Sequence, residues 1–485
     1  MRISIIDCNS YGFGQRLAVS DVIGAGPRTI AGIFEAHGIE TRIHTPDRIN
    51  FKYIQRSDLI VFSGMISDFK IIKKLSKKFK NKKQICGGMI SLEYERILAK
   101  TNIDCVVIGE GELTILELME NDFNFKALDQ GIAFKDQGKI VAKEPRRLMT
   151  EAEMEKYTKP STKRIKDYAH YYARRVYVEV LRGCSNTLPL LGKMGCGFCC
   201  VPNVFGAPRN RSEEAIVSEI KGLLEQGVKR IVLSAPDILD YKRSKPCMDP
   251  KKPWPNTKAL KSLLRSVARL CQRYQAYFRI ENIKPCLVNE DVAKVLKEMP
   301  TPRLTGIGLE SGHYKDLRLM NKPYGPREIE QAIIRLNKEN IRLNLYVIYG
   351  LRFQGTKSYR ATLFFLKKLL SKVQNIEKIT MSRFVPIPKS AFENLEPYSP
   401  KNKSLDRLLE FVRKKNLELN KKHYLGSKVE LFPVLDLGKY SLCYPKTDGP
   451  YVLVPKTNKK LVTARIVEVR ERTLYGKILD QRETI

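Results

Sequence analysis

The feature that most constrains the fold is a strand–helix alternation that runs through the chain twice. Residues 1–125 alternate short β-branched runs, such as RISIID and LIVFSGM, with amphipathic stretches such as DFKIIKKLSKKFK. From residue 176 to about 392 the alternation resumes in six strand–helix units. Alternation at this spacing predicts parallel sheets covered by helices. We therefore expect an α/β protein, with a doubly wound, Rossmann-like domain over 1–125 and a partial TIM-type (β/α)6 barrel over 173–395.

The rest of the chain has a different pattern. Residues 126–172 read as a connector, in which GIAFKDQGKIVAKE predicts a hairpin, and residues 396–424 as a basic helical linker. Residues 425–485 contain five short alternating strands separated by glycine turns. That pattern predicts a small antiparallel β-barrel of the OB type.

The net charge restricts the classes of partner. The formal charge is +35 over 485 residues, and Lys and Arg gather in runs such as KIIKKLSKKFKNKKQ. Single runs are often solvated helix faces. An excess over the whole chain instead favours polyanions, meaning RNA, DNA or acidic lipid head groups. The apolar runs are too short to span a membrane and MRISIID begins a strand, so we expect no transmembrane segment, no secretory signal and a cytoplasmic location.

Three of the eleven cysteines stand where parallel barrels place their chemistry. Cys184 directly follows a strand, and Cys196 and Cys199 form a Cys-x-x-Cys. Thiolates on a loop at the mouth of a barrel could hold three irons of a [4Fe–4S] cluster and leave the fourth iron open. A zinc site and buried, unliganded cysteines are the alternatives. Zinc commonly uses a second Cys-x-x-Cys pair, which the sequence lacks, and the five histidines are scattered.

The same region resembles the radical S-adenosylmethionine (SAM) superfamily. That family places three cluster cysteines after the first barrel strand, usually as Cys-x3-Cys-x2-Cys with an aromatic residue before the last, here Phe198. The departure is the first gap, because eleven residues separate Cys184 from Cys196. Downstream, IGLESG, LRLMNKPYGPREIEQAI, YVIYGL and RFVPIPKSAF resemble the family's later strand motifs, whereas its Gly-x-Pro-Gly-x-Thr is replaced by GLRFQGT.

The resemblance implies cofactors and site residues. It implies that a [4Fe–4S] cluster on Cys184, Cys196 and Cys199 reductively cleaves SAM to a 5′-deoxyadenosyl radical, with electrons from a reducing partner such as ferredoxin or flavodoxin. Glu310 is the implied catalytic carboxylate. Cys200 is a candidate catalytic thiol, although a bystander beside the cluster is the preferred interpretation. The implied SAM contacts are Phe198, Ser234, Asp237, Glu310, Ser311, Tyr349 and Gly350.

The N-terminal domain resembles the cobalamin-binding modules fused to many radical enzymes. The resemblance rests on GPRTIAGIFEAHGIETRIHT, ICGGMIS and DCVVIGEGELTILEL. It implies cobalamin contacts at the ends of three strands, namely Ser63, Gly64, Gly87, Gly88, Gly109, Glu110 and Gly111. Asp-x-His-x-x-Gly is absent, so a histidine ligand to cobalt is not expected. The alternatives are a domain without corrinoid, or a methylthiotransferase-like second cluster on Cys8, Cys86 and Cys105.

The C-terminal segment resembles the TRAM domain of RNA-modifying enzymes. GSKVELF, GKYSLCYP and ARIVEVRERTLYGKIL carry this resemblance, with basic residues interleaved among tyrosines. The alternative is a barrel that caps the active site for a protein or lipid substrate. The leading hypothesis is a cobalamin-dependent radical SAM C-methyltransferase that acts on RNA (tRNA or rRNA) or on a protein side chain. A cobalamin-independent radical enzyme, performing methylthiolation of tRNA or C–C bond formation on a lipid, and a non-catalytic RNA-binding protein are the competing hypotheses.

Overall fold

The computed structural model describes residues 1–8, 21–244, 248–398, 401–471 and 473–480. The chain forms two compact units, which are described separately. The first unit comprises residues 1–179 together with 209–228, and the second comprises residues 180–208 together with 229–485.

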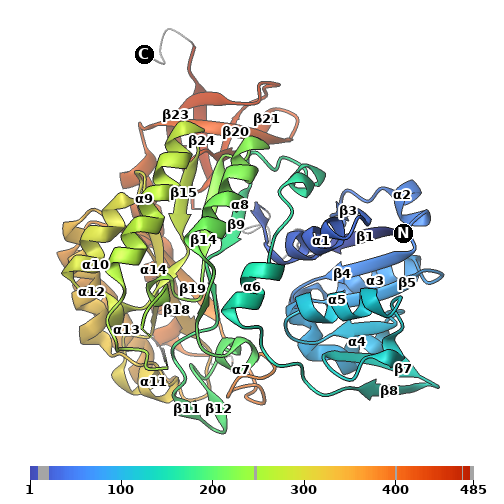
Figure 1. Cartoon of the computed structure of the whole chain (residues 1–485). Coiled ribbons are helices and arrows are strands. Elements are labelled where there is room, and N and C mark those ends of the chain that lie inside the picture. The colour runs from blue at the N-terminus through green and yellow to red at the C-terminus, as the bar shows by residue number, and fades with distance from the viewer. Residues whose placement is uncertain (9–20, 245–247, 399–400, 472, 481–485) are drawn as a thin grey trace. The chain divides into compact units, whose positions relative to one another are not determined.

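The first unit contains a large sheet and its covering helices (Figure 1). Its strands are β1 (Arg2–Asp7), β2 (Val22–Ile23), β3 (Glu40–His44), β4 (Leu59–Ser63), β5 (Lys83–Gly87), β6 (Cys105–Val107), β7 (Ile132–Asp136), β8 (Lys139–Ala142), β9 (Arg175–Glu179) and β13 (Arg209–Asn210). Its helices are α1 (Gly26–Ala36), α2 (Phe51–Gln55), α3 (Phe69–Lys78), α4 (Tyr94–Lys100), α5 (Glu112–Glu120), α6 (Glu151–Tyr157) and α8 (Glu213–Glu225).

The large sheet has the strand order β3-β1-β4-β5-β6-β7-β8. The first five strands are parallel, and β1 and β4 correspond to the predicted runs RISIID and LIVFSGM. The expected doubly wound domain is therefore confirmed. The predicted hairpin is also present as β7 and β8, but it pairs antiparallel with β6 and extends this sheet. The sheet thus reaches residue 142, beyond the boundary expected at 125.

Apolar side chains on both faces of the sheet pack against the covering helices. Ile60 and Phe62 of β4 pack with Ile72 of α3 and Ile97 of α4 in one buried cluster. Successive strand side chains point to opposite faces. On the opposite face α1 packs with α5, and a Cβ on Gly111 would contact the side chains of Ile30 and Val107.

A buried Arg–Glu–Arg triad attaches α8 to this unit. Glu219 of α8 accepts hydrogen bonds from Arg28 of α1 at 2.9 Å and from Arg211 at 2.7 Å. Arg28 also donates to the Tyr177 carbonyl and Arg211 to the Glu179 carbonyl, both on β9. All three charged side chains are at most 3% exposed. The triad links α8 to α1 and β9 of the N-terminal unit, although residues 209–228 lie within the expected barrel sequence.

The second unit contains the other barrel strands, their helices and the C-terminal barrel. Its strands are β10 (Leu181–Arg182), β11 (Pro189–Leu190), β12 (Lys193–Met194), β14 (Arg230–Ser234), β15 (Tyr277–Ile280), β16 (Asn282–Ile283), β17 (Leu304–Glu310), β18 (Arg342–Tyr349), β19 (Ile376–Arg383), β20 (Lys428–Asp436), β21 (Tyr440–Pro445), β22 (Tyr451–Pro455), β23 (Val462–Val469) and β24 (Thr473–Ile478). Its helices are α7 (Val201–Phe205), α9 (Thr257–Arg273), α10 (Glu290–Val295), α11 (Tyr314–Leu319), α12 (Pro326–Lys338), α13 (Thr356–Lys372) and α14 (Lys403–Tyr424).

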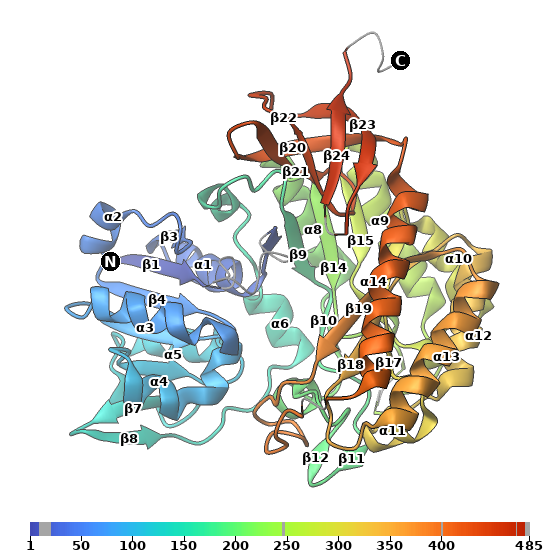
Figure 2. The same cartoon turned by 180° about the vertical axis from the view of Figure 1, so that it is seen from behind.

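Strands β14 to β19 lie within residues 176–392, where the sequence predicts the (β/α)6 barrel. β14 pairs in parallel with β15, and β16, β17, β18 and β19 follow one another in parallel. Helices α12, α13 and α14 cover the outside of these strands (Figure 2). The carboxyl ends of parallel strands lie at one edge, and therefore the loops after β14, β17 and β18 face the same side.

The C-terminal segment closes into a five-stranded barrel in the order β20-β21-β22-β24-β23. Four of its five pairings are antiparallel, as expected, but β22 and β24 pair in parallel. Such a pairing is a consequence of a Greek-key connection, which the OB type uses.

This barrel contacts the amino ends of the parallel strands. Asp448, between β21 and β22, lies 2.7 Å from Arg279 of β15 and 4.0 Å from Arg230, the first residue of β14. Tyr424 at the end of α14 donates to Glu377, the second residue of β19. Figure 1 shows β23 and β24 at one end of the unit and β11 and β12 at the other. These contacts do not support the alternative that the barrel caps the carboxyl ends of the strands.

Within the described residues, no helix is both long enough and apolar enough to cross a membrane.

Candidate functional site

The long gap between the first two predicted cluster cysteines contains a β-hairpin. Strands β11 and β12 pair antiparallel between Cys184 and Cys196. Leu191 and Gly192 form the turn, both with positive φ (49° and 74°), as a two-residue type I′ turn requires. A hairpin brings its two ends together, so Cys184 and Cys196 both lie at its base despite the eleven intervening residues.

Two asparagines hold the base of this hairpin. The Asn186 side chain donates to the Cys196 sulfur at 3.3 Å, and its backbone N–H donates to the Cys184 sulfur at 3.5 Å. The same Asn186 amide also donates to the Asn321 carbonyl. The Asn321 side chain donates to the carbonyls of Leu188 and Gly195, on the two arms of the hairpin. The sulfur atoms thus already receive N–H donors, which is how proteins tune iron–sulfur clusters.

The three thiols fit cluster ligation better than a single-ion site. Cys184, Cys196 and Cys199 are all partly exposed. In the described part of the chain, no three His, Cys, Asp or Glu side chains are arranged to hold one metal ion. A cluster needs no such convergence because each thiolate binds a different iron. Burial raises the pKa of Cys184 to about 11, although Lys284 works in the opposite direction, so metal binding would release protons.

A buried charge network lies directly behind Cys184. The Ser185 hydroxyl donates to Asp240 at 2.8 Å, and Asp240 also accepts from Arg243 at 2.5 Å and from Lys284 at 2.7 Å. Asp237, fully buried, lies 3.3 Å from Lys284. Burial raises the pKa of Asp237 to about 6, and the neighbouring Lys284 opposes that shift. We call residues 183–200, which carry the three predicted cluster cysteines, the cysteine loop. The network fixes the start of this loop against the residues that follow β14.

Glu310 occupies a strained position at the end of β17. Its φ is +58°, next to a register shift between Gly308 and Glu310. A Cβ on Gly308 would lie 2.5 Å from the Glu310 carboxylate, so only glycine permits this side-chain position. Lys322 donates to Glu310 at 3.0 Å, and Tyr324 donates to the Gly308 carbonyl at 2.8 Å.

Lys322 is a site residue that the sequence analysis did not identify. Its side chain is 9% exposed and its ammonium lies 5.3 Å from the centre of the Phe198 ring. Burial opposes its charge, but Cys196 and Glu310 outweigh that effect and raise the pKa of Lys322 well above its usual value. A buried cation between the cysteine loop and Glu310 suits a carboxylate ligand. The only sequence signal was a lysine in LRLMNK.

The other predicted SAM contacts differ in how far their side chains are already engaged by other residues of the protein. Ser234 donates to Glu281 at 2.6 Å, and Ser311 is buried and donates to Asp316 at 2.8 Å. Tyr349 ends β18 and Gly350 follows it, and the Tyr398 N–H donates to the Gly350 carbonyl. Phe198 packs against a buried cluster around Met320, Leu351, Phe384 and Phe392. The hydroxyls of Ser234 and Ser311 are thus engaged within the protein, and their predicted SAM contacts remain predictions.

Cys200 precedes α7 and is 3% exposed. Burial raises the pKa of its thiol. Its carbonyl accepts hydrogen bonds from Asn203 and Val204 in the first turn of α7. These features favour the bystander interpretation over a catalytic thiol.

The predicted cobalamin contacts lie together at the carboxyl edge of the first unit's sheet. Ser63 and Gly87 are register partners at the ends of β4 and β5. Gly88 packs against Gly64, because a Cβ there would lie 2.8 Å from the Gly64 carbonyl oxygen. Gly109 faces open space and Gly87 nearly so, where a side chain would otherwise project. These open positions fit a flat ligand approaching the backbone.

Glu110 has a different role from the one expected. Its two carboxylate oxygens accept hydrogen bonds from Arg209 at 2.7 and 3.0 Å, and Oε2 also accepts from the Met149 N–H. The residue is 7% exposed. Both oxygens are therefore committed to an internal ion pair, and Glu110 is poorly placed to bind cobalamin.

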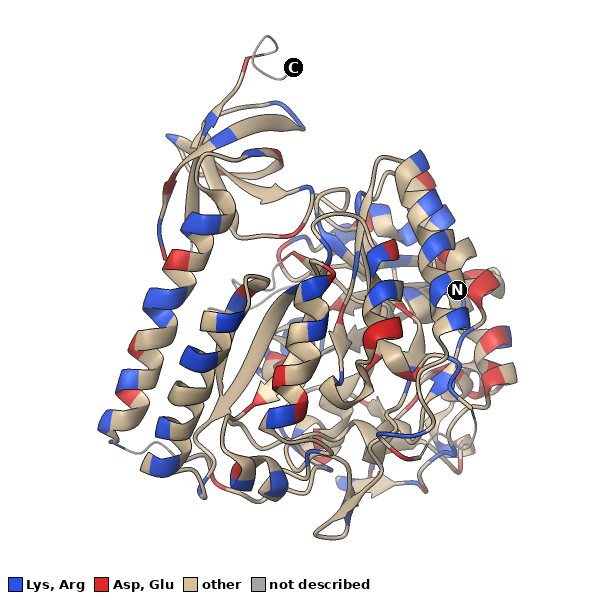
Figure 3. Cartoon of the chain, turned by 90° about the vertical axis from the view of Figure 1, so that its left-hand side faces the viewer, with Lys and Arg blue, Asp and Glu red and all other residues tan. Residues whose placement is uncertain are grey.

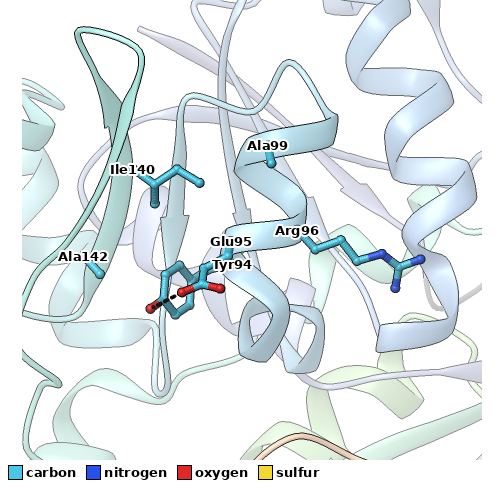
Figure 4. Close-up of a pocket in the computed structure, with 6 residues that line it drawn as sticks. All are labelled: Tyr94, Glu95, Arg96, Ala99, Ile140 and Ala142. Atoms are coloured by element: carbon cyan, nitrogen blue, oxygen red, sulfur yellow. Dashed lines mark hydrogen bonds between the residues drawn. The ribbon is translucent and has the colours of Figure 1, made fainter.

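One surface pocket of the first unit lies away from this edge. It is lined by residues of α4 and β8, namely Tyr94, Glu95, Arg96, Ala99, Ile140 and Ala142 (Figure 4). None of the predicted cobalamin contacts lines it. Figure 4 shows Arg96 directed away from Ile140 and Ala142, and the Glu95 carboxylate accepting a hydrogen bond from the Tyr94 hydroxyl.

The cysteines offered for a second cluster are core residues. Cys8, Cys86 and Cys105 are each 0% exposed. Cys8 and Cys86 belong to the apolar cluster between the sheet and α3. Burial raises the pKa of Cys86 to about 12. A second cluster on these residues is therefore not supported.

The rings of all five histidines have hydrogen-bond partners within the protein. Each ring hydrogen-bonds within the protein, His37 to Ile33, His44 to Ser4 and Asn50, His170 to Tyr172, His313 to Asp316 and His423 to Ile376. At least one ring nitrogen of each histidine is therefore engaged within the protein.

Known proteins resemble the chain in sequence and in fold. Residues 178–366 match the Radical SAM superfamily. The uncharacterized protein MJ1620 of Methanocaldococcus jannaschii is 38% identical, and the match covers 99% of each chain. The ribosomal protein uS12 methylthiotransferase RimO of Desulfitobacterium hafniense is 27% identical over 48% of each chain.

Two solved structures share the fold over most of the chain. One is the radical SAM methyltransferase TsrM of Kitasatospora setae, with a TM-score of 0.60, 14% identity and coverage of 81% of this chain and 75% of that chain. The other is the cobalamin-dependent SAM radical enzyme OxsB, with a TM-score of 0.59, 13% identity and coverage of 87% and 56%. The chain therefore belongs to the radical SAM superfamily, as a radical SAM enzyme.

Proposed function

We propose that this enzyme is a cobalamin-dependent radical SAM methyltransferase whose substrate is RNA or a protein side chain. The observation that carries the proposal is the coexistence of two sites in one fold. The second unit has three partly exposed thiols beside a buried Glu310–Lys322 pair. The first has a glycine-lined edge that is open at Gly87 and Gly109. TsrM and OxsB, which share this fold, are cobalamin enzymes by their own descriptions.

In this proposal Cys184, Cys196 and Cys199 hold the cluster. When bound, the cluster and the corrinoid supply the electron that cleaves SAM and the methyl group that is transferred. The protein's own groups orient the reactants. Lys322 offers a cation for the SAM carboxylate, Glu310 accepts hydrogen bonds from its donors, and the Asn186 amide donates to the Cys196 sulfur. We also propose that the domains of this enzyme meet near residues 172, 395 and 424, as expected from the sequence.

The methylthiotransferase alternative is weaker for a structural reason. RimO supports a relation to that branch. The second cluster expected of it, however, would need Cys8, Cys86 and Cys105, which are enclosed in the apolar core.

The test is anaerobic reconstitution with iron, sulfide and hydroxocobalamin, followed by desalting and metal analysis. Retention of cobalt beside one cluster supports the proposal, whereas iron without cobalt rejects the cobalamin part. Cys199→Ala should abolish reductive SAM cleavage, and Cys200→Ala is the matched control that should retain it. Cleavage by Cys199→Ala would reject the ligand assignment.

A further inference from the structure

The only tryptophan of the chain is exposed beside the cysteine loop. Trp254 is 57% exposed and lies in the loop that follows β14, on the carboxyl side of the parallel strands. Met248 in the same loop is 52% exposed, and its carbonyl accepts a hydrogen bond from the Thr187 hydroxyl at 2.7 Å. Thr187 lies between Cys184 and Cys196, so this loop borders the entrance of the site.

The backbone beside Trp254 is held by the buried charge network behind Cys184. Arg243 is 3% exposed and donates to the Pro253 carbonyl at 2.9 and 2.5 Å. It also donates to the Ser185 hydroxyl at 3.1 Å and to Asp240. One side chain thus ties the residue before Trp254 to the residue after Cys184. A large apolar ring on a loop held this firmly is a preformed contact surface, because little entropy is lost when a ligand stacks on it.

A row of cations begins immediately after Trp254. Helix α9 carries five basic side chains and no acidic one, namely Lys258, Lys261, Arg265, Arg269 and Arg273. Its opposite face is buried through Leu260, Leu264 and Val267. The cations recur every three or four residues and therefore share the outer face of the helix. Arg265 alone has a carboxylate partner in the described chain, Glu298 at 3.0 Å.

Helix α14 is also rich in basic residues, but several of its basic side chains have carboxylate partners. Figure 3 shows Lys and Arg on many outer helices, often beside Asp or Glu. On α14, Lys414 and Arg413 pair with Glu410, and Lys415 pairs with Glu418. That run is a solvated face of compensated charge, whereas α9 presents uncompensated charge next to an aromatic ring.

Helix α9 runs from the entrance of the site toward the C-terminal barrel. Its first residue follows the Trp254 loop, and its length is about 24 Å. At its other end the Tyr274 carbonyl accepts from Lys229, which precedes Arg230. Arg230 lies 4.0 Å from Asp448 of the barrel. The row of cations therefore connects the two ends of the second unit.

We propose that Trp254 and the α9 cations form a binding track for single-stranded RNA, with a base stacked on Trp254 and phosphates along α9. This rests on the proposed function and names RNA as its substrate class. An aromatic platform beside a row of cations is the combination that binds single strands. A folded acidic protein or a lipid surface would use the charge but has no purine or pyrimidine to stack on Trp254.

The test uses the full-length, cluster-reconstituted enzyme without turnover. Because Trp254 is the only tryptophan, its fluorescence reports on this site alone. Short single-stranded oligoadenylate should quench it saturably, and anionic phosphatidylglycerol vesicles and heparin should not. Trp254→Ala should weaken RNA binding, followed by anisotropy of labelled RNA, by about 5- to 150-fold, and Trp254→Phe should retain most of the affinity.

Charge variants test the track itself. Replacing Lys258, Lys261 and Arg269 by Ala should reduce the slope of log K against log salt by about 2. The control removes three exposed lysines of α3, Lys70, Lys73 and Lys77, and should leave the slope nearly unchanged. Absence of quenching by RNA, or equal effects of the two triple variants, would overturn the inference. RNA binding that depends on Trp254 in an enzyme that methylates nothing would support the track and reject the proposed reaction.

Discussion

The buried ion pair between Lys322 and Glu310 allows a quantitative prediction. The two groups are 3.0 Å apart, and their side chains are 9% and 8% exposed. At that distance their attraction is about 5–6 kcal/mol for an effective dielectric constant of 20. Lys322→Met removes the cation and leaves the Glu310 carboxylate buried without its partner. Such changes cost about 3–5 kcal/mol, because the remaining charge keeps its desolvation penalty.

A matched control separates burial from simple ion pairing. Lys251 and Glu328 form a pair of nearly the same length, 2.9 Å, but their side chains are 48% and 40% exposed. Lys251→Met should cost no more than about 1 kcal/mol. Urea unfolding followed by Trp254 fluorescence reports on the second unit for both variants. The Lys322→Met midpoint should fall by at least about 1 M, given typical urea dependences.

The double variant completes the test. Lys322→Met with Glu310→Leu removes both charges and should recover most of the lost stability. It should nevertheless fail to bind SAM, measured by anaerobic calorimetry, since both groups are proposed SAM contacts. The reasoning is refuted if Lys322→Met and Lys251→Met shift the midpoint equally, or if the double variant is no more stable than Lys322→Met.

Three further predictions concern other parts of the chain. Asn186→Leu removes the amide that donates to the Cys196 sulfur. If this hydrogen bond favours the reduced cluster by ~1 kcal/mol, its loss should lower the cluster's reduction potential by about 40 mV. An EPR-monitored redox titration measures the potential, and an unchanged value would contradict the prediction. Arg209→Met should destabilise the first unit by about 3–5 kcal/mol because Glu110 stays buried, and adding Glu110→Gln should restore much of this in urea unfolding. Burial lowers the pKa of His44 from 6.5 to about 4. As the pH falls below 6.5, His44 is therefore protonated in the unfolded chain before it is protonated in the folded chain. The free energy of unfolding should consequently fall by up to about 3 kcal/mol between pH 6.5 and pH 4. His44→Asn should show a shallower decline in urea midpoints measured across that range, and parallel declines would contradict this.

Much of the fold could be predicted because local patterns agree with it. The five parallel strands of the N-terminal sheet and the strands of the (β/α)6 barrel are buried β-branched runs bounded by turn residues, which is the strongest signal that a single sequence carries. The glycine turns and alternation after residue 425 likewise predicted the small barrel. The parallel β22–β24 pairing could not be predicted, since it depends on how the chain closes and not on either strand alone.

The site was predictable where motifs carry it and less so where distant residues complete it. Cys196, Phe198 and Cys199 stand in one short motif. Glu110 also stands in a motif, but its partner Arg209 lies 99 residues away, and no local signal shows that this arginine occupies both carboxylate oxygens. Lys322 is one of many lysines in a strongly basic chain, so only its burial beside Glu310 distinguishes it.

The spacing of the cysteines and the place of the small barrel lead to one argument about substrate access. The hairpin between Cys184 and Cys196 adds residues at the entrance of the site, and the β11–β12 turn exposes Leu191 to 76%. The C-terminal barrel instead contacts the amino ends of the strands through Asp448. A substrate held by that barrel must therefore be long enough to reach around the parallel strands to the cysteines. A flexible polymer meets this requirement and a small metabolite does not, which is why the outer face of α9, and not the barrel alone, is the surface to test first.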